Sequence, residues 1–159
     1  MNDTIDKVPL PIYAIHVTGE CRMTLRILIV DDEPAIHEVM ASYLKKFLDD
    51  FEILTATTGA KAIERATSCI DKGRSLDFVL MDLKMPDMDG LECTKRLTEM
   101  GIKNIHLLTA YFDTDSLSHA VEVGAKGVLK KSEGFASIAR KVANIMRGTQ
   151  EPTPTSNPN

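Results

Sequence analysis

The chain has no tryptophan and only three cysteines among its 159 residues. Cys21, Cys69 and Cys93 are odd in number, widely spaced and without a CxxC pair, which argues against a disulfide framework and against a zinc site. This cysteine usage is typical of a reducing cytoplasm. The sequence also lacks the GxxxxGK[ST] pattern of a phosphate-binding P-loop.

A strong excess of positive charge is also missing. The formal net charge is -4 and the pI is near 5.6, which argues against a protein that mainly coats nucleic acid or an anionic membrane. Basic partners or metal ions fit this balance better. The hydrophobic content of 43% supports a globular protein, and the length leaves room for one domain with a proper core but not for a second.

Both ends of the sequence differ from its middle. Residues 1–22 contain a short apolar patch that Pro9 and Pro11 interrupt, too short to span a bilayer and without the basic cluster of a signal peptide. We expect a flexible extension there, with a partner-binding arm as the alternative. Residues 148–159 are rich in Pro, Thr and Asn and predict a disordered tail. The folded domain should therefore cover residues 23–147.

Strand and helix signals alternate regularly between these ends and predict five βα units. The strands are expected at Leu25–Val30, Glu52–Ala56, Phe78–Met81, Ile105–Leu108 and Gly127–Lys130. Helical spacing follows each strand, with the inward faces Ile36, Val39, Met40, Tyr43, Leu44, Phe47, Leu48, then Ala62, Ile63, Ala66, Ile70, then Leu91, Thr94, Leu97, then 116–123, then Phe135, Ile138, Ala139, Val142, Met146. A helix in each connection makes the sheet parallel, with helices on both faces.

Polar residues stand at or just past the ends of four of these strands. Asp31 and Asp32 leave the first strand and Asp82 the third, while Thr109 and Lys131 follow the fourth and fifth. Ligands of open α/β sheets bind outside the carboxyl ends of the strands, so these residues should converge on one pocket. Adjacent acids are by themselves more often a helix cap. Three acids at one edge repel one another unless they share a cation, however, and hard oxygen ligands suit Mg²⁺.

Thr109 and Lys131 suggest that the pocket also takes a phosphoryl group. Taken singly, Thr109 reads as a strand-end hydroxyl bonded to local backbone and Lys131 as a solvated lysine. Beside the acids, Thr109 can donate a hydrogen bond to one phosphoryl oxygen and Lys131 can pair with another. Asp82 is then the nucleophile that forms an acyl phosphate.

The same residues resemble a response-regulator receiver domain of bacterial two-component signalling, of the chemotaxis-regulator type. The motifs are DD at Asp31 and Asp32, MDLKMPDMDG with Asp82, LLTA with Thr109 and GAKGVLKKS with Lys131, within a match from about residue 24 to 147. The resemblance implies a five-stranded, doubly wound, flavodoxin-like α/β sheet of order 2-1-3-4-5. It also implies that Asp82 accepts a phosphoryl group from a phosphohistidine on a sensor kinase or phosphotransfer protein. Mg²⁺ would contact Asp32, Asp82 and the main-chain carbonyl of Lys84, with Asp31 acting largely through water.

Two positions depart from the family pattern. Val128 stands where receivers usually carry an aromatic switch residue, and Ser132 stands where proline commonly follows the lysine. Lys84 and Tyr111 occupy the positions, two after the acceptor and two after the threonine, that in this family tune loss of the phosphoryl group. We expect Tyr111 to slow hydrolysis by shielding the site from water.

The predicted function is a cytoplasmic, phosphorylation-activated regulator that signals through protein contact, without direct contact to nucleic acid or membrane, and that is a phosphoacceptor rather than an enzyme. Dimerisation on phosphorylation stays open. The alternatives are the receiver part of a larger DNA-binding transcription factor and a receiver-like binding module that is never phosphorylated. An aspartyl phosphatase is less well supported, because such enzymes carry a second acid two positions after the first, where this chain has Lys84.

Overall fold

Five short apolar segments form one parallel sheet in the computed structural model, which describes residues 24–111 and 113–148. The strands are β1 Leu25–Val30, β2 Phe51–Ala56, β3 Phe78–Asp82, β4 Ile105–Thr109 and β5 Gly127–Lys130, in the order β2-β1-β3-β4-β5. β3 and β4 are buried at every position, as expected of central strands covered on both faces. The predicted α/β class, the parallel pairing and the strand order are confirmed.

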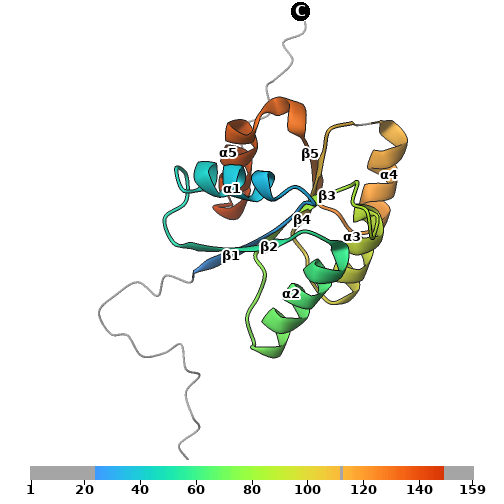
Figure 1. Cartoon of the computed structure of the whole chain (residues 1–159), viewed down its shortest axis with the longest axis horizontal. Helices are drawn as coiled ribbons and strands as arrows, with labels where there is room; N and C mark the ends of the chain where they lie inside the picture. The colour runs from blue at the N-terminus through green and yellow to red at the C-terminus, as the bar shows by residue number, and fades with distance from the viewer. Residues whose placement is uncertain (1–23, 112, 149–159) are drawn as a thin grey trace, which may run out of the picture.

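Five helices cover the two faces of this sheet (Figure 1). They are α1 Pro34–Leu44, α2 Gly59–Asp71, α3 Gly90–Glu99, α4 Thr114–Glu122 and α5 Phe135–Met146, and a single 3₁₀ turn, Lys131–Glu133, joins β5 to α5. Figure 1 shows α1 and α5 together on one side of the sheet and α2 and α3 on the other. This layering produces two apolar clusters, because alternate residues of each strand point to opposite faces.

The two clusters divide the strand residues as that alternation requires. Ile27, Ile29, Phe78 and Leu80 pack with Met40 and Leu44 of α1 and with Ile138 and Val142 of α5. Leu28, Val30, Val79 and Met81 pack with Ala62 and Ala66 of α2, Leu97 of α3 and Ala120 of α4. Both faces are therefore dry, and polar side chains of the central strands are confined to the strand ends, with the exception of His106.

The helix pattern was partly wrong. Ile70, expected on the inward face of α2, is 45% exposed, and Cys69 is buried instead. The buried residues Ala62, Ala66 and Cys69 are spaced by four and three, and Ile70 lies one further residue, about 100°, around the helix. Helix α1 ends at Leu44, so Phe47 and the buried Leu48 belong to the turn that follows it, while His37 is buried without having been predicted so.

Some element boundaries also moved by one or two residues. β2 begins at Phe51, and α4 begins at Thr114 because the carboxylate of Asp113 accepts a hydrogen bond from the N–H of Ser116 at 2.6 Å. β3 and β4 each extend by one residue, so Asp82 and Thr109 are the last residues of their strands. Their backbones are consequently held by the sheet, which fixes where their side chains begin.

Within residues 24–111 and 113–148, no helix is long and apolar enough to cross a membrane. The predicted N-terminal extension and C-terminal tail, 1–22 and 148–159, lie outside the described residues except for Gly148. The domain boundaries predicted from the sequence therefore stay a prediction.

Candidate functional site

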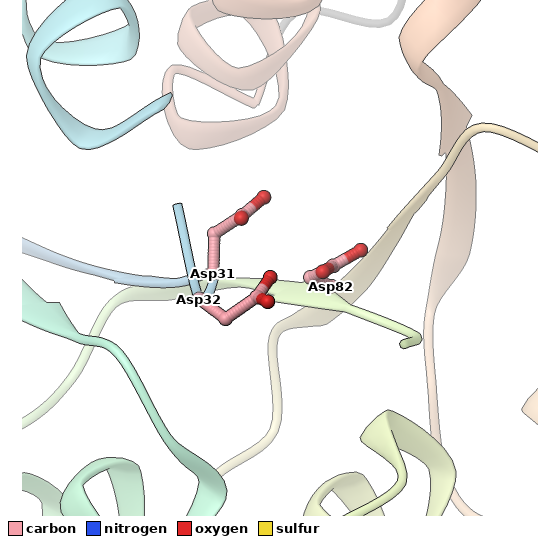
Figure 2. A group of neighbouring side chains, drawn as sticks. All are labelled: Asp31, Asp32 and Asp82. Atoms are coloured by element: carbon pink, nitrogen blue, oxygen red, sulfur yellow. The ribbon is translucent and has the colours of Figure 1, made fainter. Parts of the chain in front are cut away.

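Three carboxylates meet at the carboxyl end of the sheet. Each of Asp31, Asp32 and Asp82 places one carboxylate oxygen within 4.8 Å of the corresponding oxygens of the others. The register of the sheet causes this: Val30 of β1 lies opposite Met81 of β3, so Asp31 and Asp82 are equivalent positions on neighbouring strands. Figure 2 shows the three side chains next to one another, two just past the end of β1 and one at the end of β3. Asp31 and Asp82 are buried and Asp32 is exposed.

One lysine faces this acidic cluster. The Nζ of Lys131 lies 3.1 Å from Oδ2 of Asp31 and 3.4 Å from Oδ1 of Asp82, although one hundred residues separate Lys131 from Asp31. Burial lowers the pKa of Lys131, but the hydrogen bond to Asp31 and the charges of both aspartates outweigh burial and raise it. Lys131 is therefore fully charged at neutral pH. A single ammonium beside three carboxylates leaves the fully ionised pocket with a net negative charge.

Asp82 is strongly affected by these surroundings. Burial, followed by the negative charge of Asp31, raises its pKa from 3.8 to about 6, and Lys131 opposes both effects. An ionised Asp82 is thus held at an energetic cost that a nearby cation would relieve. The surroundings of the Asp82 carboxylate therefore favour the binding of a cation next to it.

Asp31 is oriented by the backbone on both sides of it. The N–H of Glu33 donates to its Oδ1 at 2.9 Å, and its own N–H donates to the carbonyl of Ala56 at 3.1 Å. With Oδ2 bonded to Lys131, both oxygens have a partner. Asp31 therefore acts as a fixed buried charge, while the exposed Asp32 is free to meet a hydrated ion.

Thr109 lies at the same edge, but its hydroxyl is engaged locally. It donates to the carbonyl of Tyr111 at 2.5 Å and accepts from the N–H of Tyr111 at 3.1 Å. This is the local backbone arrangement that competed with the phosphoryl role in the sequence. A role in binding a phosphoryl oxygen requires rotation of the side chain away from Tyr111.

Lys84 and Tyr111 lie close to each other, two residues after Asp82 and Thr109 respectively. The Nζ of Lys84 lies 5.4 Å from the centroid of the Tyr111 ring, and the tyrosine is 78% exposed. These are the two positions that the sequence singled out for control of hydrolysis. Val128, in the place of the aromatic switch, is only partly buried and packs against the cluster under α2, α3 and α4.

The donor set suits a hard divalent cation. Carboxylate and carbonyl oxygens are preferred by Mg²⁺, Mn²⁺ and Ca²⁺, whereas sulfur and imidazole ligands are absent from this cluster. The raised pKa of Asp82 is the second sign, because burial and then the charge of Asp31 make its ionised form costly, and a bound cation would offset that cost. The residues present thus fit a metal site, and the role of the Lys84 carbonyl in it stays a prediction.

Sequence reasoning missed Asp87, in the loop that follows Asp82. Its two carboxylate oxygens accept hydrogen bonds from the N–H groups of Gly59 and Ala60, both at 3.2 Å. The partners lie 28 and 27 residues away, so no local spacing rule indicates the contact. Only the folded arrangement of α2 against this loop shows it.

Among proteins of known function, several bacterial regulators are similar to this chain. It is 33% identical over 125 residues to the transcriptional regulatory protein LnrK of Bacillus subtilis, covering 78% of this chain and 54% of LnrK. It is 30% identical over 127 residues to a cyclic di-GMP phosphodiesterase of Thermotoga maritima, covering 77% of this chain and 31% of that protein. A third relative is the transcriptional regulatory protein LiaR of B. subtilis, of which this chain covers 57%. The chain therefore spans about half the length of most of these relatives.

Solved structures show the same fold. A response regulator receiver domain protein from Methanospirillum hungatei superposes with a TM-score of 0.67 at 22% identity, covering 80% of this chain and 97% of that one. The Mn²⁺-bound form of response regulator Rcp1 gives a TM-score of 0.67 at 19% identity, covering 81% and 99%. The sequence model of the response regulator receiver domain family matches residues 27–143, which include every residue of the acidic site. The chain belongs to the response regulator receiver domain family.

Proposed function

We propose that this chain is a phosphorylation-activated response regulator that accepts a phosphoryl group on Asp82. The observation that carries the proposal is the buried Asp82 carboxylate, crowded by Asp31 and Asp32 and contacted by Lys131 at 3.4 Å. A structural aspartate would be paired one to one. Here the excess of negative charge favours a site that binds a cation and then a phosphoryl group.

The transfer itself requires little covalent chemistry from the protein. An ionised oxygen of Asp82 attacks phosphorus, an O–P bond forms, and the bond from phosphorus to the donor breaks. With a phosphohistidine donor, the electron pair of the P–N bond returns to the imidazole nitrogen, which is protonated on leaving. Lys131 stands where it can neutralise a phosphoryl oxygen during this step.

Mg²⁺ is the proposed cofactor, held by Asp32, Asp82 and the Lys84 carbonyl, with Asp31 in support. When bound, the ion would neutralise negative charge on the phosphoryl oxygens. The acidic cluster supports this, and Rcp1, a similar fold, is known with Mn²⁺ bound. Asp31, fixed by Glu33 and Lys131, would keep the pocket negative without leaving its place.

Signalling would follow a shift of population between two arrangements. After transfer, the Thr109 hydroxyl would exchange its hydrogen bonds to Tyr111 for one to a phosphoryl oxygen, which would release the backbone of Tyr111. Leu117 and Val121 of α4 are exposed apolar residues, 40% and 65% accessible, and suit a protein contact on the surface formed by α4, β5 and α5. The downstream partner, or a second copy of the chain, would bind there.

The proposed donor is a sensor histidine kinase or a phosphotransfer protein, and the proposed compartment is the cytoplasm, as for the family. One relative is named a phosphodiesterase, but this chain covers 31% of it, and the residues described here support a phosphoacceptor rather than a hydrolase. The second candidate function is the receiver part of a transcription factor. The coverage of 54% of LnrK and 57% of LiaR, both named transcriptional regulatory proteins, favours it over the module that is never phosphorylated.

Incubation with acetyl phosphate and Mg²⁺, followed by intact mass, tests the phosphoacceptor role. We expect one added phosphoryl group on the native chain, with acetate as the leaving group, and none on Asp82→Asn. Asp77→Asn is the matched control, because Asp77 precedes the same strand that Asp82 ends. It should be phosphorylated like the native chain. An unmodified native chain, or equal modification of Asp82→Asn, would contradict the proposal.

A further inference from the structure

The loop between β3 and α3, residues 83–89, is tied to itself at both ends; we call it the acceptor loop. The N–H of Gly90 donates to the carbonyl of Leu83 at 2.9 Å, and a Cβ on Gly90 would lie 2.2 Å from the carbonyl oxygen of Asp82. Asp89 accepts a hydrogen bond from the N–H of Leu91 at 2.8 Å and caps α3. The loop ends are therefore held beside Asp82, whereas its middle needs another support.

That support comes from α2, on the other side of the acidic site. The carboxylate of Asp87 accepts the N–H groups of Gly59 and Ala60, each at 3.2 Å through a separate oxygen. Next to this contact, a Cβ on Gly59 would lie 2.9 Å from Cβ of Met88, so only glycine lets the two backbones approach this closely. Cys93 of α3 adds a weak hydrogen bond from its Sγ to the carbonyl of Gly59 at 3.7 Å.

The start of α2, where Asp87 makes its contacts, is itself connected to the end of β1 that lies beside the acidic site. The N–H of Asp31 donates to the carbonyl of Ala56, the last residue of β2, and only two residues separate Ala56 from Gly59. The chain and these hydrogen bonds therefore connect Asp31 through Ala56 and Gly59 to the side chain of Asp87 and then along the loop to Asp82, and the pairing of β3 with β1 closes the ring. Two carboxylates of the acidic site stand on this ring.

We propose that Asp87 is a positioning residue for metal binding and phosphoryl transfer, which holds the acceptor loop, and with it the Lys84 carbonyl, against the start of α2. This proposal rests on the proposed function of the same site. Asp87 does not touch the reacting groups. It acts by keeping an oxygen ligand where a cation with strict geometry can use it, since Mg²⁺ tolerates little displacement of its ligands.

A purely structural role for Asp87 would be the capping of α2, and the chain offers a matched control for it. Thr58 caps the same helix end, because its Oγ1 accepts the N–H of Lys61 at 3.1 Å. Thr58→Ala removes one oxygen that accepts an N–H of the first turn of α2, and Asp87→Ala removes two. Only the second change disconnects the acceptor loop.

The test measures Mg²⁺ affinity by isothermal titration calorimetry, melting temperature, and the rate of phosphorylation by acetyl phosphate at subsaturating Mg²⁺, for the full chain and each variant. We expect Asp87→Ala to weaken Mg²⁺ binding about tenfold, the lower end of what loss of a supporting group around a metal site causes. Its phosphorylation rate should fall by the same factor and recover at high Mg²⁺. Thr58→Ala should have a lower melting temperature than the native chain but the same Mg²⁺ affinity. Asp87→Asn, which retains one acceptor oxygen, should fall between the native chain and Asp87→Ala.

Equal Mg²⁺ affinity in Asp87→Ala and Thr58→Ala would overturn the positioning role. If Asp87→Ala does not fold, the comparison of Asp87→Asn with Thr58→Ala decides in the same way. Failure of the native chain to take up a phosphoryl group would instead contradict the proposed function. The affinity measurements on the native chain and variants keep the two failures apart.

Discussion

The two ends of the sheet carry charged groups in opposite ways. At the amino end, Arg26 of β1 donates through Nε to Glu52 of β2 at 3.0 Å, and its backbone N–H donates to the carboxylate of Asp77 at 2.7 Å. Asn104, just before β4, donates to the carbonyl of Asp77 at 3.0 Å. At the carboxyl end, three carboxylates lie together, and Lys131 contacts two of them, Asp31 and Asp82. The paired groups at the amino end stabilise the fold, whereas the carboxyl end keeps a net negative charge that a bound ligand is needed to neutralise.

The charged groups at the two ends of the sheet have opposite effects on the stability of the fold. Paired polar groups at strand ends satisfy the backbone and join neighbouring strands, at little net electrostatic cost. Crowded buried acids oppose folding until a cation or a proton arrives. Removal of one acid should therefore have opposite effects on stability at the two ends.

The largest expected effect is on the free energy of unfolding without metal. At pH 8, Asp82→Asn should raise it by up to about 3 kcal/mol, since the carboxyl no longer has to be ionised with a pKa near 6 instead of 3.8. Asp77→Asn should lower it by about 1 kcal/mol, because the N–H of Arg26 then donates to a neutral amide oxygen instead of a charged carboxylate. Urea unfolding followed by far-UV circular dichroism measures both. Changes of the same sign in the two variants would contradict the proposed difference between the two ends of the sheet.

The second prediction concerns pH. The pKa of Asp82 is higher in the folded chain than in the unfolded one, so the folded state binds more protons there, and the stability that Asp82 contributes falls as pH rises from about 4 to 7. His106 has the opposite dependence. It is buried against Phe78, with ring centroids 4.6 Å apart, and burial lowers its pKa to about 4, so protonation of the unfolded state below pH 6.5 destabilises the fold.

The two groups should nearly cancel in the native chain between pH 4 and 7. Asp82→Asn removes one of them, and its stability should then fall by about 3 kcal/mol from pH 7 to pH 4 through His106 alone. The difference between Asp82→Asn and the native chain should be largest above pH 7 and close near pH 4. Urea unfolding at several pH values measures it, and a difference that is constant with pH would contradict the assignment to Asp82.

Bound Mg²⁺ should change the stability of the same variants by a smaller amount. A cation that binds only the folded chain stabilises it by about 1.4 kcal/mol at ten times its dissociation constant. We expect this gain for the native chain and for Asp77→Asn at pH 8, and a much smaller one for Asp82→Asn. Thermal unfolding with and without Mg²⁺ measures it, and Ca²⁺ or Mn²⁺ should replace Mg²⁺ in part. An equal shift in Asp82→Asn would place the ion elsewhere.

The smallest effect concerns the aromatic ring of Tyr111. Tyr111→Ala should shorten the lifetime of the phosphorylated chain by about two- to fivefold, because the ring next to Lys84 no longer limits the approach of water. Loss of the phosphoryl group is followed by intact mass after removal of acetyl phosphate. Tyr111→Phe keeps the ring and serves as the control, with a lifetime near that of the native chain. An unchanged lifetime in Tyr111→Ala would refute the shielding role.

Local patterns predicted the strands better than the helix faces. β1 and β5 begin and end where expected, although Arg26 lies within β1 and the exposed Lys130 ends β5. Ile70 shows the limit of the same reasoning in a helix. Ile70 and Cys69 are both compatible with an inward face by hydrophobicity, and the packing of α2 against α3 and the sheet selected Cys69. His37 and His106 were missed as buried residues for a related reason, because nothing local marks a histidine that packing covers.

The site divides in the same manner. The positions of Asp31, Asp32, Asp82, Thr109 and Lys131 at strand ends were evident from the chain, and parallel pairing alone places them at one edge. Which atoms touch was not. The bond of Lys131 to Asp31, the turn of the Thr109 hydroxyl toward Tyr111, and the contact of Asp87 with α2 each depend on side-chain directions that spacing does not encode.

The fold class follows from the amino-acid pattern, because apolar strands alternating with amphipathic helices bury their apolar faces when helices cover both sides of a parallel sheet, and because acids at the carboxyl ends of neighbouring parallel strands lie at the same edge. The electrostatics of the site depend on folding. Burial of Asp82 beside Asp31 raises the pKa of Asp82 to about 6, and the approach of Lys131 opposes this rise. Such shifts depend on distance and on exclusion of water, which exist only once the chain has folded.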